Sequence, residues 1–179
     1  LALIACGVKP GDEVIVPPYT FIATASTVIE ANCVPVFVDL DPDTYNISPQ
    51  AIEAAITPRT KVIVPVHFGG QSCDMDAIMD IAKRHNLRVI EDAAHAHGAE
   101  YKGKKLGSIG DVGSFSFQSS KNLTAGEGGI VVTDDDELYA MMNSLRNVGR
   151  IEGGQWYDHY NPGCNYRITQ MQAVLLSAR

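Results

Sequence analysis

The sequence predicts an α/β fold with a mostly parallel sheet and flanking helices. Short apolar segments rich in β-branched residues recur along the first half of the chain, and segments with helical periodicity separate them. Strands that alternate with helices in this way form βαβ units, whose strands run parallel between helical layers. With 179 residues, 45% hydrophobic and 20% charged, the chain has the composition of one globular domain with a sizeable core.

The first half of the chain supplies most of the predicted sheet, with strands over residues 13–17, 35–40, 61–66 and 88–92. None alternates strictly between apolar and polar residues, so we expect them to be buried on both faces. Ser48 and Pro49 have the residue types of a helix N-cap and a first helical position. The apolar residues of segment 75–82 repeat with a helical period, and basic residues follow in what would be the last turn.

The second half departs from this regular pattern. Shorter strands are predicted over 114–117 and 129–133, followed by a helix over 137–148. The tract 149–167 is rich in glycine, asparagine and aromatic residues without a period, which indicates a long functional loop. The residues after it have helical spacing up to the last residue, and the first residues read as the end of a helix before Gly7. We therefore expect the chain to be part of a longer protein.

The net charge narrows the class of partner, and the cysteines indicate the cellular compartment. A net charge of -7 argues against nucleic acid or an anionic membrane surface as partner, so a small molecule is expected. No apolar run approaches the roughly 20 residues of a membrane helix. The four cysteines contain no CxxC pair, and we interpret them as reduced thiols in the core of a cytoplasmic protein.

The candidate site follows from the predicted sheet, because ligands of open parallel sheets bind beyond the carboxyl ends of the strands. This rule selects His67, the segment 19–21, Asp92 and the segment 114–129. Asp92 is either a helix N-cap or a functional carboxylate, since an acid at the end of a buried strand is costly to ionise without a partner.

A metal site is a weaker interpretation of the same region. Glu91, Asp92, His95 and His97 are all potential ligands within seven residues. However, a complete set of ligands would need residues from elsewhere, and the sequence contains no HxxE or CxxC motif to supply them. We therefore expect no metal.

Lys121 is the most informative single residue, because it lies between a serine-rich strand end and a glycine-rich turn at 126–129. In an ATP-binding loop of the Walker A type the lysine follows the glycines, whereas here it precedes them. A lysine nucleophile combined with the strand-end carboxylate of Asp92 is expected for pyridoxal phosphate: the amine holds the aldehyde and the acid keeps the ring nitrogen protonated. Phe21 or Tyr19 is then available to stack on the ring, and Ser116 to hold the phosphate.

Several long motifs in order carry a resemblance that covers essentially the whole chain. They include "GDEVIVPPYTFIATAS", "PVFVDLDPDTYNI", "VIEDAAHAHGAEYKGKKLGSIGDVGSFSFQSSKNLTAGEGGIVVT" and "GCNYRITQMQAV". In these the chain resembles the DegT/StrS family of pyridoxal phosphate-dependent sugar aminotransferases, which have the fold type I architecture. The resemblance implies that residues 1–179 are a partial cofactor-binding large domain, with an upstream phosphate-binding segment and a C-terminal small domain outside them. We expect this piece alone to bind the cofactor weakly or not at all.

The resemblance also implies a role for each matching residue. Lys121 would form the Schiff base with the cofactor and shuttle a proton, and Asp92 would bind the pyridine nitrogen. His95, where many members carry glutamine, would lie near the ring hydroxyl. Ser116 would contact the phosphate, and Phe21 would stack on the ring.

Family membership would further imply a homodimer with shared active sites. Asn165, or alternatively Arg167, would reach the cofactor phosphate of the partner subunit. The reaction would move an amino group from glutamate, or glutamine, to a nucleotide-linked keto sugar. Relatives with histidine in place of the lysine perform dehydration, so Lys121 favours a transaminase. A pyridoxal phosphate-dependent dehydratase or lyase, and a non-catalytic regulator that binds the cofactor or a nucleotide sugar, remain alternatives.

Overall fold

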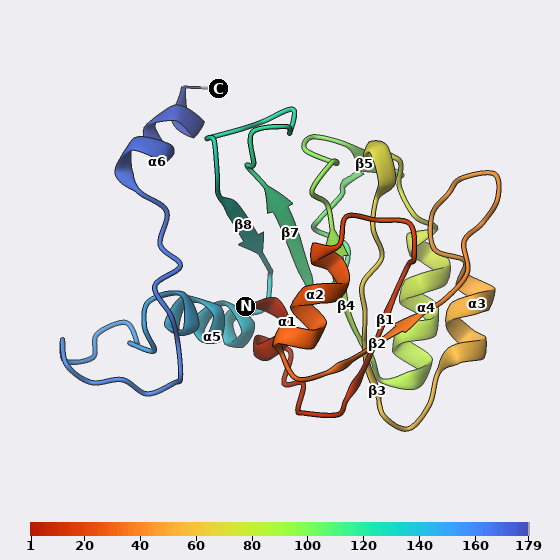
Figure 1. Cartoon of the computed structure of the whole chain (residues 1–179), viewed down its shortest axis with the longest axis horizontal. Coiled ribbons are helices and arrows are strands. Elements are labelled where there is room, and N and C mark those ends of the chain that lie inside the picture. The colour runs from red at the N-terminus through yellow and green to blue at the C-terminus, as the bar shows by residue number, and fades with distance from the viewer. Residues whose placement is uncertain (179) are drawn as a thin grey trace.

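The central feature of the computed structural model, which describes residues 1–178, is a six-stranded sheet (Figure 1). Its strands lie in the order β2-β1-β3-β4-β7-β8, and all run parallel except β8, which pairs antiparallel with β7. The strands are β1 (Glu13–Val16), β2 (Val34–Phe37), β3 (Thr60–Ile63), β4 (Arg88–Asp92), β7 (Val112–Ser116) and β8 (Gly129–Val132). The predicted α/β fold with a mostly parallel sheet is therefore confirmed.

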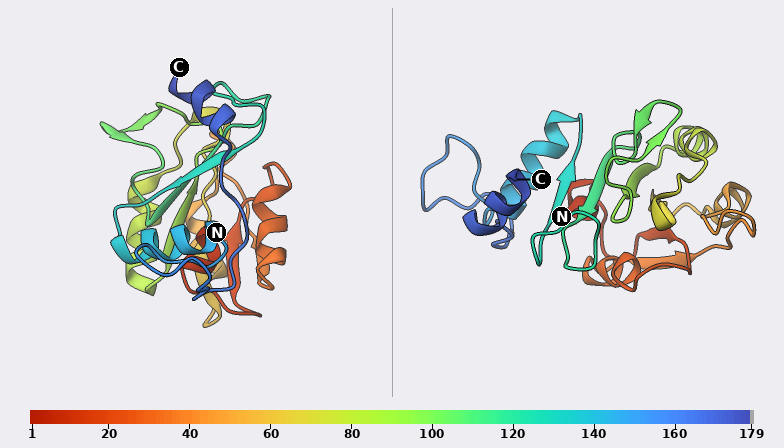
Figure 2. Two further views of the ribbon diagram at one scale, coloured as in Figure 1. Left: turned by 90° about the vertical axis from the view of Figure 1, so that its left-hand side faces the viewer. Right: turned by 90° about the horizontal axis from the view of Figure 1, so that it is seen from above.

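Helices lie on both sides of the sheet (Figure 2). They are α1 (Ala2–Ala5), α2 (Ala23–Glu30), α3 (Pro49–Ala55), α4 (Met75–His85), α5 (Asp136–Arg146) and α6 (Gln170–Ser177), with a short 3-10 turn, η1 (Phe68–Gly70). A two-stranded hairpin of β5 (Glu100–Tyr101) and β6 (Lys104–Lys105) follows β4. No helix within residues 1–178 has the length and apolar character needed to cross a membrane.

Two hydrophobic cores form because neighbouring residues of a strand point to opposite faces. In β1, Val14 and Val16 pack on the side covered by α1, α2 and α5, where they join Val28 of α2. Between them, Ile15 points to the side covered by α3 and α4 and packs with Ile52. The parallel sheet is thus buried between two helical layers, as the lack of strict alternation in these strands predicts.

The same alternation in β4 determines where its acidic residues point. Ile90 belongs to the core on the α2 side, and Val89 belongs to the core on the α3–α4 side. Two residues further along, Asp92 returns to the α2 side, whereas Glu91 lies on the opposite side. Two adjacent carboxylates at one strand end are thereby separated by the sheet.

The caps of α3 and α4 agree with the helix starts and ends that the sequence indicates. The Ser48 hydroxyl accepts a hydrogen bond from the backbone N–H of Ala51 at 3.3 Å, with Pro49 in the first turn of α3. Helix α4 begins after Asp74, whose carboxylate accepts from Ala77 at 3.2 Å, and it ends at the left-handed residue Asn86. These side chains satisfy N–H groups that the first turn of a helix leaves without partners.

Two expectations are wrong in detail, and one helix is missing from the prediction. Strand β2 is not buried on both faces, because it forms an edge of the sheet and exposes Val34 and Phe37. Cys164 is exposed, whereas Cys33 and Cys73 are buried as expected. Helix α2, which covers the sheet beside β1, is not among the predicted elements at all.

The loop predicted over 149–167 contains no helix or regular strand, which confirms it as a loop. Within it the Arg150 guanidinium lies over the Trp156 ring at 3.9 Å, and Asn165 forms an isolated bridge with Asn147. The helix predicted after the loop is α6, which begins with a capping box between Thr169 and Gln172.

Candidate active site

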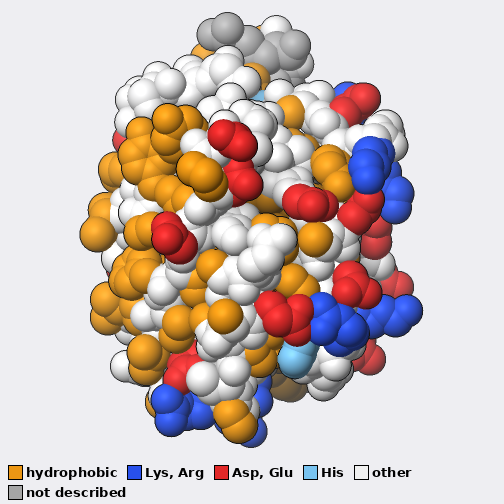
Figure 3. Space-filling model, turned by 90° about the vertical axis from the view of Figure 1, so that its right-hand side faces the viewer, with side chains coloured by type: hydrophobic (Ala, Val, Ile, Leu, Met, Phe, Trp, Pro, Cys, Tyr) orange, Lys and Arg blue, Asp and Glu red, His pale blue; other side chains and the backbone are white. Residues whose placement is uncertain are grey.

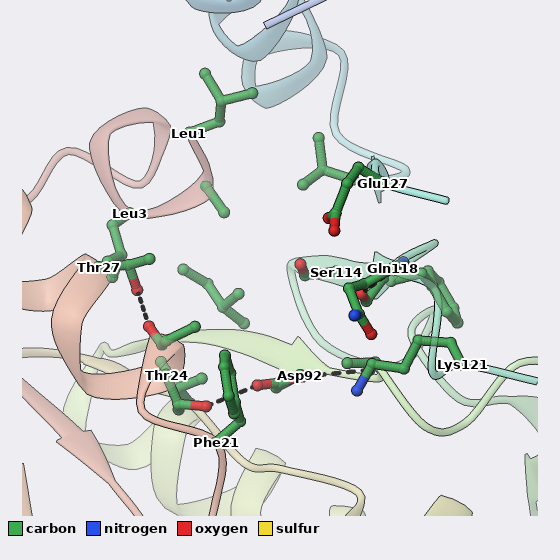
Figure 4. Close-up of a pocket in the computed structure, with 18 of the residues that line it drawn as sticks. Leu1, Leu3, Phe21, Thr24, Thr27, Asp92, Ser114, Gln118, Lys121 and Glu127 are labelled. Carbon is green, nitrogen blue, oxygen red and sulfur yellow. Dashed lines mark hydrogen bonds between the residues drawn. The ribbon is translucent and has the colours of Figure 1, made fainter. Parts of the chain in front are cut away.

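A cavity of about 710 Å³ lies at the carboxyl ends of β4 and β7 (Figure 4). Helices α1 and α2, strand β8 and the segment after β7 complete its walls. Its polar lining residues are Thr24, Thr27, Asp92, Ser114, Ser116, Gln118, Ser120, Lys121 and Glu127. The apolar lining includes Leu3, Val64 and Ile90, so the charged groups face a partly apolar space.

Asp92 is held in this cavity by bonds to both its backbone and its side chain. Its backbone N–H donates to the Pro65 carbonyl at 2.8 Å, and its own carbonyl accepts from the N–H of His67 at 3.0 Å. One carboxylate oxygen accepts from the Thr24 hydroxyl at 2.9 Å, and the other accepts from the N–H of Ala94 at 3.2 Å. A carboxylate has acceptor capacity for more than two donors, so Asp92 can still bind a donor in the cavity.

Two threonine hydroxyls support Asp92 from the side, Thr24 in the first turn of α2 and Thr20 just before that helix. Because Thr24 donates its single proton to Asp92, it must act as the acceptor in its 2.8 Å bond with Thr20. The order of donation is therefore Thr20 to Thr24 to Asp92. The two hydroxyls thereby orient the carboxylate.

Lys121 lines the same cavity from the glycine-rich segment that follows β7. This segment folds back on itself: Phe117 donates its N–H to Gly128 at 2.8 Å, and Ala125 donates to the Phe117 carbonyl at 2.9 Å. Gly126 and Gly128 have φ values of +83° and +140°, which glycine adopts easily. The half-buried Lys121 forms no salt bridge within residues 1–178, so its amine is available to a ligand.

The cavity also brings together two further predicted residues. Ser116 is the last residue of β7, and its hydroxyl accepts from the N–H of Gln118 at 3.3 Å. Phe21 precedes α2 and is 75% exposed at the cavity. Tyr19, the other aromatic candidate, packs against the Phe68 ring at 4.6 Å instead. Figure 4 shows Lys121, Asp92 and Phe21 around the same space.

Two predicted residues lie outside this group. His95 is exposed, its ring lies 6.2 Å from that of Phe68, and it is not among the residues that line the cavity. Asn165 is exposed in the long loop, where its side-chain oxygen accepts from the N–H of Arg167 at 3.3 Å. The Arg167 guanidinium in turn donates to Asn147 at 2.7 Å. The roles expected for these residues stay predictions.

His67 and His97, which the sequence also singles out, do not line the cavity. His67 is fully buried and bonds to Glu91 at 2.9 Å. The His97 ring packs against Phe115 and Phe117, with centroids 5.3 and 5.8 Å away, and burial lowers its pKa, which favours the neutral ring. No group of three or more potential metal ligands occurs among the described residues.

Sequence reasoning missed the residues that α2 contributes, above all Thr24, because no motif marks a threonine as the partner of a distant aspartate. It also missed Glu127, whose carboxylate points into the cavity (Figure 4). Glu127 belongs to the segment 114–129, in which the sequence singles out Ser116, Lys121 and the glycines. A polar residue inside a segment expected to approach a ligand is the signal that points to it.

The family follows from a comparison with known sequences. The family model of the DegT/DnrJ/EryC1/StrS aminotransferases matches residues 1–179. The chain belongs to this family. The resemblance inferred from the motifs is thereby confirmed, and the fold is that of the fold type I aminotransferases.

Individual relatives of this DegT/StrS-family chain are sugar aminotransferases. It is 53% identical over 175 residues to GDP-perosamine synthase from Caulobacter vibrioides, covering 98% of this chain and 47% of the relative. It is 54% identical over 179 residues to UDP-N-acetyl-3-dehydro-α-D-glucosamine 3-aminotransferase from Acidithiobacillus ferrooxidans, covering 99% and 48%. The chain therefore spans about half the length of these relatives.

A solved structure extends the comparison to the cofactor. The chain superimposes with a TM-score of 0.89 and 36% identity on the PLP-form of the putative sugar aminotransferase Spr1654 from Streptococcus pneumoniae, covering 98% of this chain and 50% of that one. The residues that line the cavity of the present chain fit such a cofactor. Asp92 retains acceptor capacity, the Lys121 amine forms no salt bridge within residues 1–178, and apolar side chains line the same cavity.

Proposed function

We propose that the protein is a pyridoxal phosphate-dependent aminotransferase that moves an amino group from glutamate, or glutamine, to a nucleotide-linked keto sugar. The observation that carries the proposal is the shared cavity of Lys121 and Asp92 at the carboxyl ends of the parallel strands. The names of the two relatives, a GDP-sugar synthase and a UDP-sugar 3-aminotransferase, support a nucleotide-linked sugar as acceptor.

Each cavity residue has a proposed task in binding the cofactor. Asp92 would accept a hydrogen bond from the protonated ring nitrogen, and its negative charge would stabilise that proton. Ser116 would donate to the phosphate, and Phe21 would cover one face of the ring. His95 would lie near the ring hydroxyl, and either Asn165 or Arg167 would reach the phosphate in the partner subunit. When bound, the cofactor supplies an aldehyde that amines attack and a ring that withdraws electrons.

The protein's own contribution to the chemistry centres on Lys121. Its amine would attach to the cofactor aldehyde in the resting enzyme, and once released it would carry a proton between the α-carbon of the amino donor and the former aldehyde carbon of the cofactor. The hydroxyls of Thr20 and Thr24 hold Asp92 in place during both half-reactions. Apolar residues such as Leu3 and Ile90 line the same cavity and would make the surroundings of a bound cofactor less polar.

The decisive experiment tests Lys121 in the full-length protein. Borohydride reduction in the presence of pyridoxal phosphate should attach the cofactor covalently to the wild-type protein, and Lys121→Ala should abolish this attachment. Lys61→Ala is the matched control, because Lys61 is exposed near the amino end of β3, away from the carboxyl ends of the strands, where it donates to the Pro58 carbonyl. Attachment that persists in Lys121→Ala would contradict the assignment.

The same protein distinguishes transfer from the alternative functions. Adding glutamate should convert the visible absorbance of the bound cofactor to that of its amine form, whereas a non-catalytic regulator would leave the spectrum unchanged. A panel of nucleotide-linked keto sugars should then restore the original spectrum for the true acceptor. A product that has lost water without gaining nitrogen would identify a dehydratase instead.

We further propose that the enzyme is a cytoplasmic homodimer with shared active sites. The chain exposes large apolar side chains beside the cavity and on the adjoining edge strand, namely Phe21, Ile22, Ile29, Val34 and Phe37. Figure 3, which shows the side of the molecule that lies on the right in Figure 1, has hydrophobic side chains gathered toward one edge and charged groups toward the other. An exposed apolar area of this kind next to a site is typical of an interface between subunits.

A further inference from the structure

A second carboxylate lies behind the cavity wall, on the other face of the sheet. Glu91 precedes Asp92 in β4 and is fully buried. One of its oxygens accepts from the N–H groups of Ile109 and Gly110, each at 2.6 Å. The other accepts from the N–H of Gly107 at 2.8 Å and from His67 at 2.9 Å. All four acceptor positions of this carboxylate are therefore used.

His67 has a defined protonation state in this arrangement. Its Nδ1 accepts a hydrogen bond from the backbone N–H of Cys73 at 3.2 Å, so the ring carries its proton on Nε2. That proton is donated to Glu91. The backbone N–H of the same His67 donates to the carbonyl of Asp92. His67 thus contacts both acidic residues of β4, one through its ring and one through its main chain.

Glu91 remains charged despite its burial. Burial alone would raise the pKa of Glu91, but the hydrogen bonds from His67, Gly110, Gly107 and Ile109 outweigh it and hold the pKa below its ordinary value. A buried carboxylate with four donors holds those donors in fixed positions, because a displaced donor would leave the charge without compensation.

The hydrogen bonds of Glu91 connect the segments that carry the cavity residues. The turn 107–110 leads into β7, which ends at Ser116. The turn lies close against that strand, since a Cβ on Gly113 would lie 2.0 Å from the Gly107 carbonyl oxygen. On the other side, Glu91 binds the segment after β3 through His67. The end of β4, with Asp92, is fixed between the two.

We infer that Glu91, together with His67, is a positioning residue for the cofactor: it fixes the end of β4 so that the Asp92 carboxylate meets the ring nitrogen in one orientation. The inference deepens the proposed function and rests on it. Neither Glu91 nor His67 touches the cavity, so they act through the backbone and through the side chain of Asp92. A binding residue is precise when the residues behind it lock its geometry.

The test compares Glu91→Gln with a matched control in the full-length protein. Glutamine keeps the shape but presents an NH₂ group to a site that contains only donors. Glu13→Gln is the control, because Glu13 is also a buried, hydrogen-bonded carboxylate, with Thr57, Arg59 and Thr60 as donors, but lies at the opposite end of the parallel strands. Both variants lose stability, and only Glu91→Gln should affect the cofactor.

Two readouts separate positioning from general destabilisation. The first is the dissociation constant of pyridoxal phosphate at a temperature where both variants are folded, which should rise about tenfold in Glu91→Gln and stay at the wild-type value in Glu13→Gln. The second is the visible circular dichroism of the bound cofactor, which reports ring orientation and should change only in Glu91→Gln. His67→Gln, which leaves the three backbone donors in place, should show a smaller effect of the same sign and decides the question if Glu91→Gln does not fold.

The outcomes distinguish this inference from the proposed function. If the wild-type protein does not bind pyridoxal phosphate, both are wrong. If the wild type binds but Glu91→Gln and His67→Gln keep its affinity and dichroism, only the positioning role is wrong. Equal losses of affinity in Glu91→Gln and Glu13→Gln would also overturn it, because they would assign the effect to stability alone.

Discussion

At the level of single residues, β4 gives two adjacent acids opposite surroundings. Asp92 faces a cavity and is bound by Thr24 and Ala94, whereas Glu91 is enclosed by donors on the other side of the sheet. The alternation of side chains along a strand is sufficient to produce this difference. The chemical similarity of neighbouring residues therefore says little about their tasks.

The buried carboxylates make stability depend on pH. Hydrogen bonds from Thr57 and Arg59 outweigh burial and lower the pKa of Glu13, and the pKa of Glu91 is lowered as well. A carboxylate with a depressed pKa stabilises the folded state above its unfolded value of 4.5, and this contribution is lost as the pH falls through the folded value. We therefore expect the free energy of unfolding to decrease below about pH 4.5, measured by urea denaturation.

Variants provide the control for this pH dependence. Glu13→Gln and Glu91→Gln should each be less stable than the wild type at neutral pH and should each lose less stability between neutral and acidic pH. A variant that retained the full wild-type acid dependence would show that its carboxylate does not contribute.

Among the site residues, those with distinctive chemistry could be predicted from the sequence and those that support them could not. Lys121 and Asp92 can be predicted because the two together, a lysine before a glycine-rich turn and an acid at the end of a buried strand, are the pair expected for pyridoxal phosphate, although each taken alone has a structural explanation. Thr24 was not found, because its contact with Asp92 joins residues 68 positions apart and depends on how α2 packs. No local sequence motif indicates that packing.

At the level of elements, α2 is the clearest example of a helix without a sequence signature. It begins without a side-chain cap, it buries Thr24, Ala25 and Val28, and it exposes Ile22 and Ile29 around them. A helix with apolar residues on both its buried and its exposed side does not show the single apolar stripe that predicts α4. The sequence predicts the six strands of the central sheet to within a few residues, because their β-branched runs lie between clear helix or turn signals, but it does not predict the short hairpin of β5 and β6.

The contribution of α2 to the site can be measured with Thr24→Val. This substitution removes the hydroxyl that donates to Asp92 while keeping the side chain branched and similar in size. Because a hydrogen bond to a charged group contributes about 1.5 kcal/mol or more, affinity for pyridoxal phosphate should fall about tenfold.

The matched control lies on the same helix. Thr27→Val also removes a hydroxyl next to the cavity, but that hydroxyl donates to the Ala23 carbonyl at 2.9 Å rather than to Asp92. It should leave the affinity near the wild-type value. Equal effects of the two substitutions would show that the bond to Asp92 has no special importance.

At the level of the whole molecule, the proposed dimer makes a prediction that mutant mixtures can test. If each site combines Lys121 of one chain with Asn165 of its partner, dimers mixed from Lys121→Ala and Asn165→Ala chains contain one intact site. Two inactive preparations, dissociated and reassociated together, should then recover about a quarter of wild-type activity, because half of the dimers are mixed and each has one working site of two.

The same mixture also excludes the alternative. If both residues served the site of their own chain, every site in the mixture would lack one of them, and no activity would return. Repeating the experiment with Arg167→Ala in place of Asn165→Ala decides which of the two residues crosses to the partner.

The separation of the sheet into two sides guides enzyme engineering. Changes meant to accept a new sugar belong in the loop 149–167, where no regular element would be broken, or on the α2 side of the cavity. The α3–α4 side, where Glu91 and His67 are buried and bonded to each other, is a poor place for diversification even though neither residue lines the cavity. In a library that randomises both acids of β4, a change in substrate specificity could not be told apart from the loss of the contacts that position Asp92.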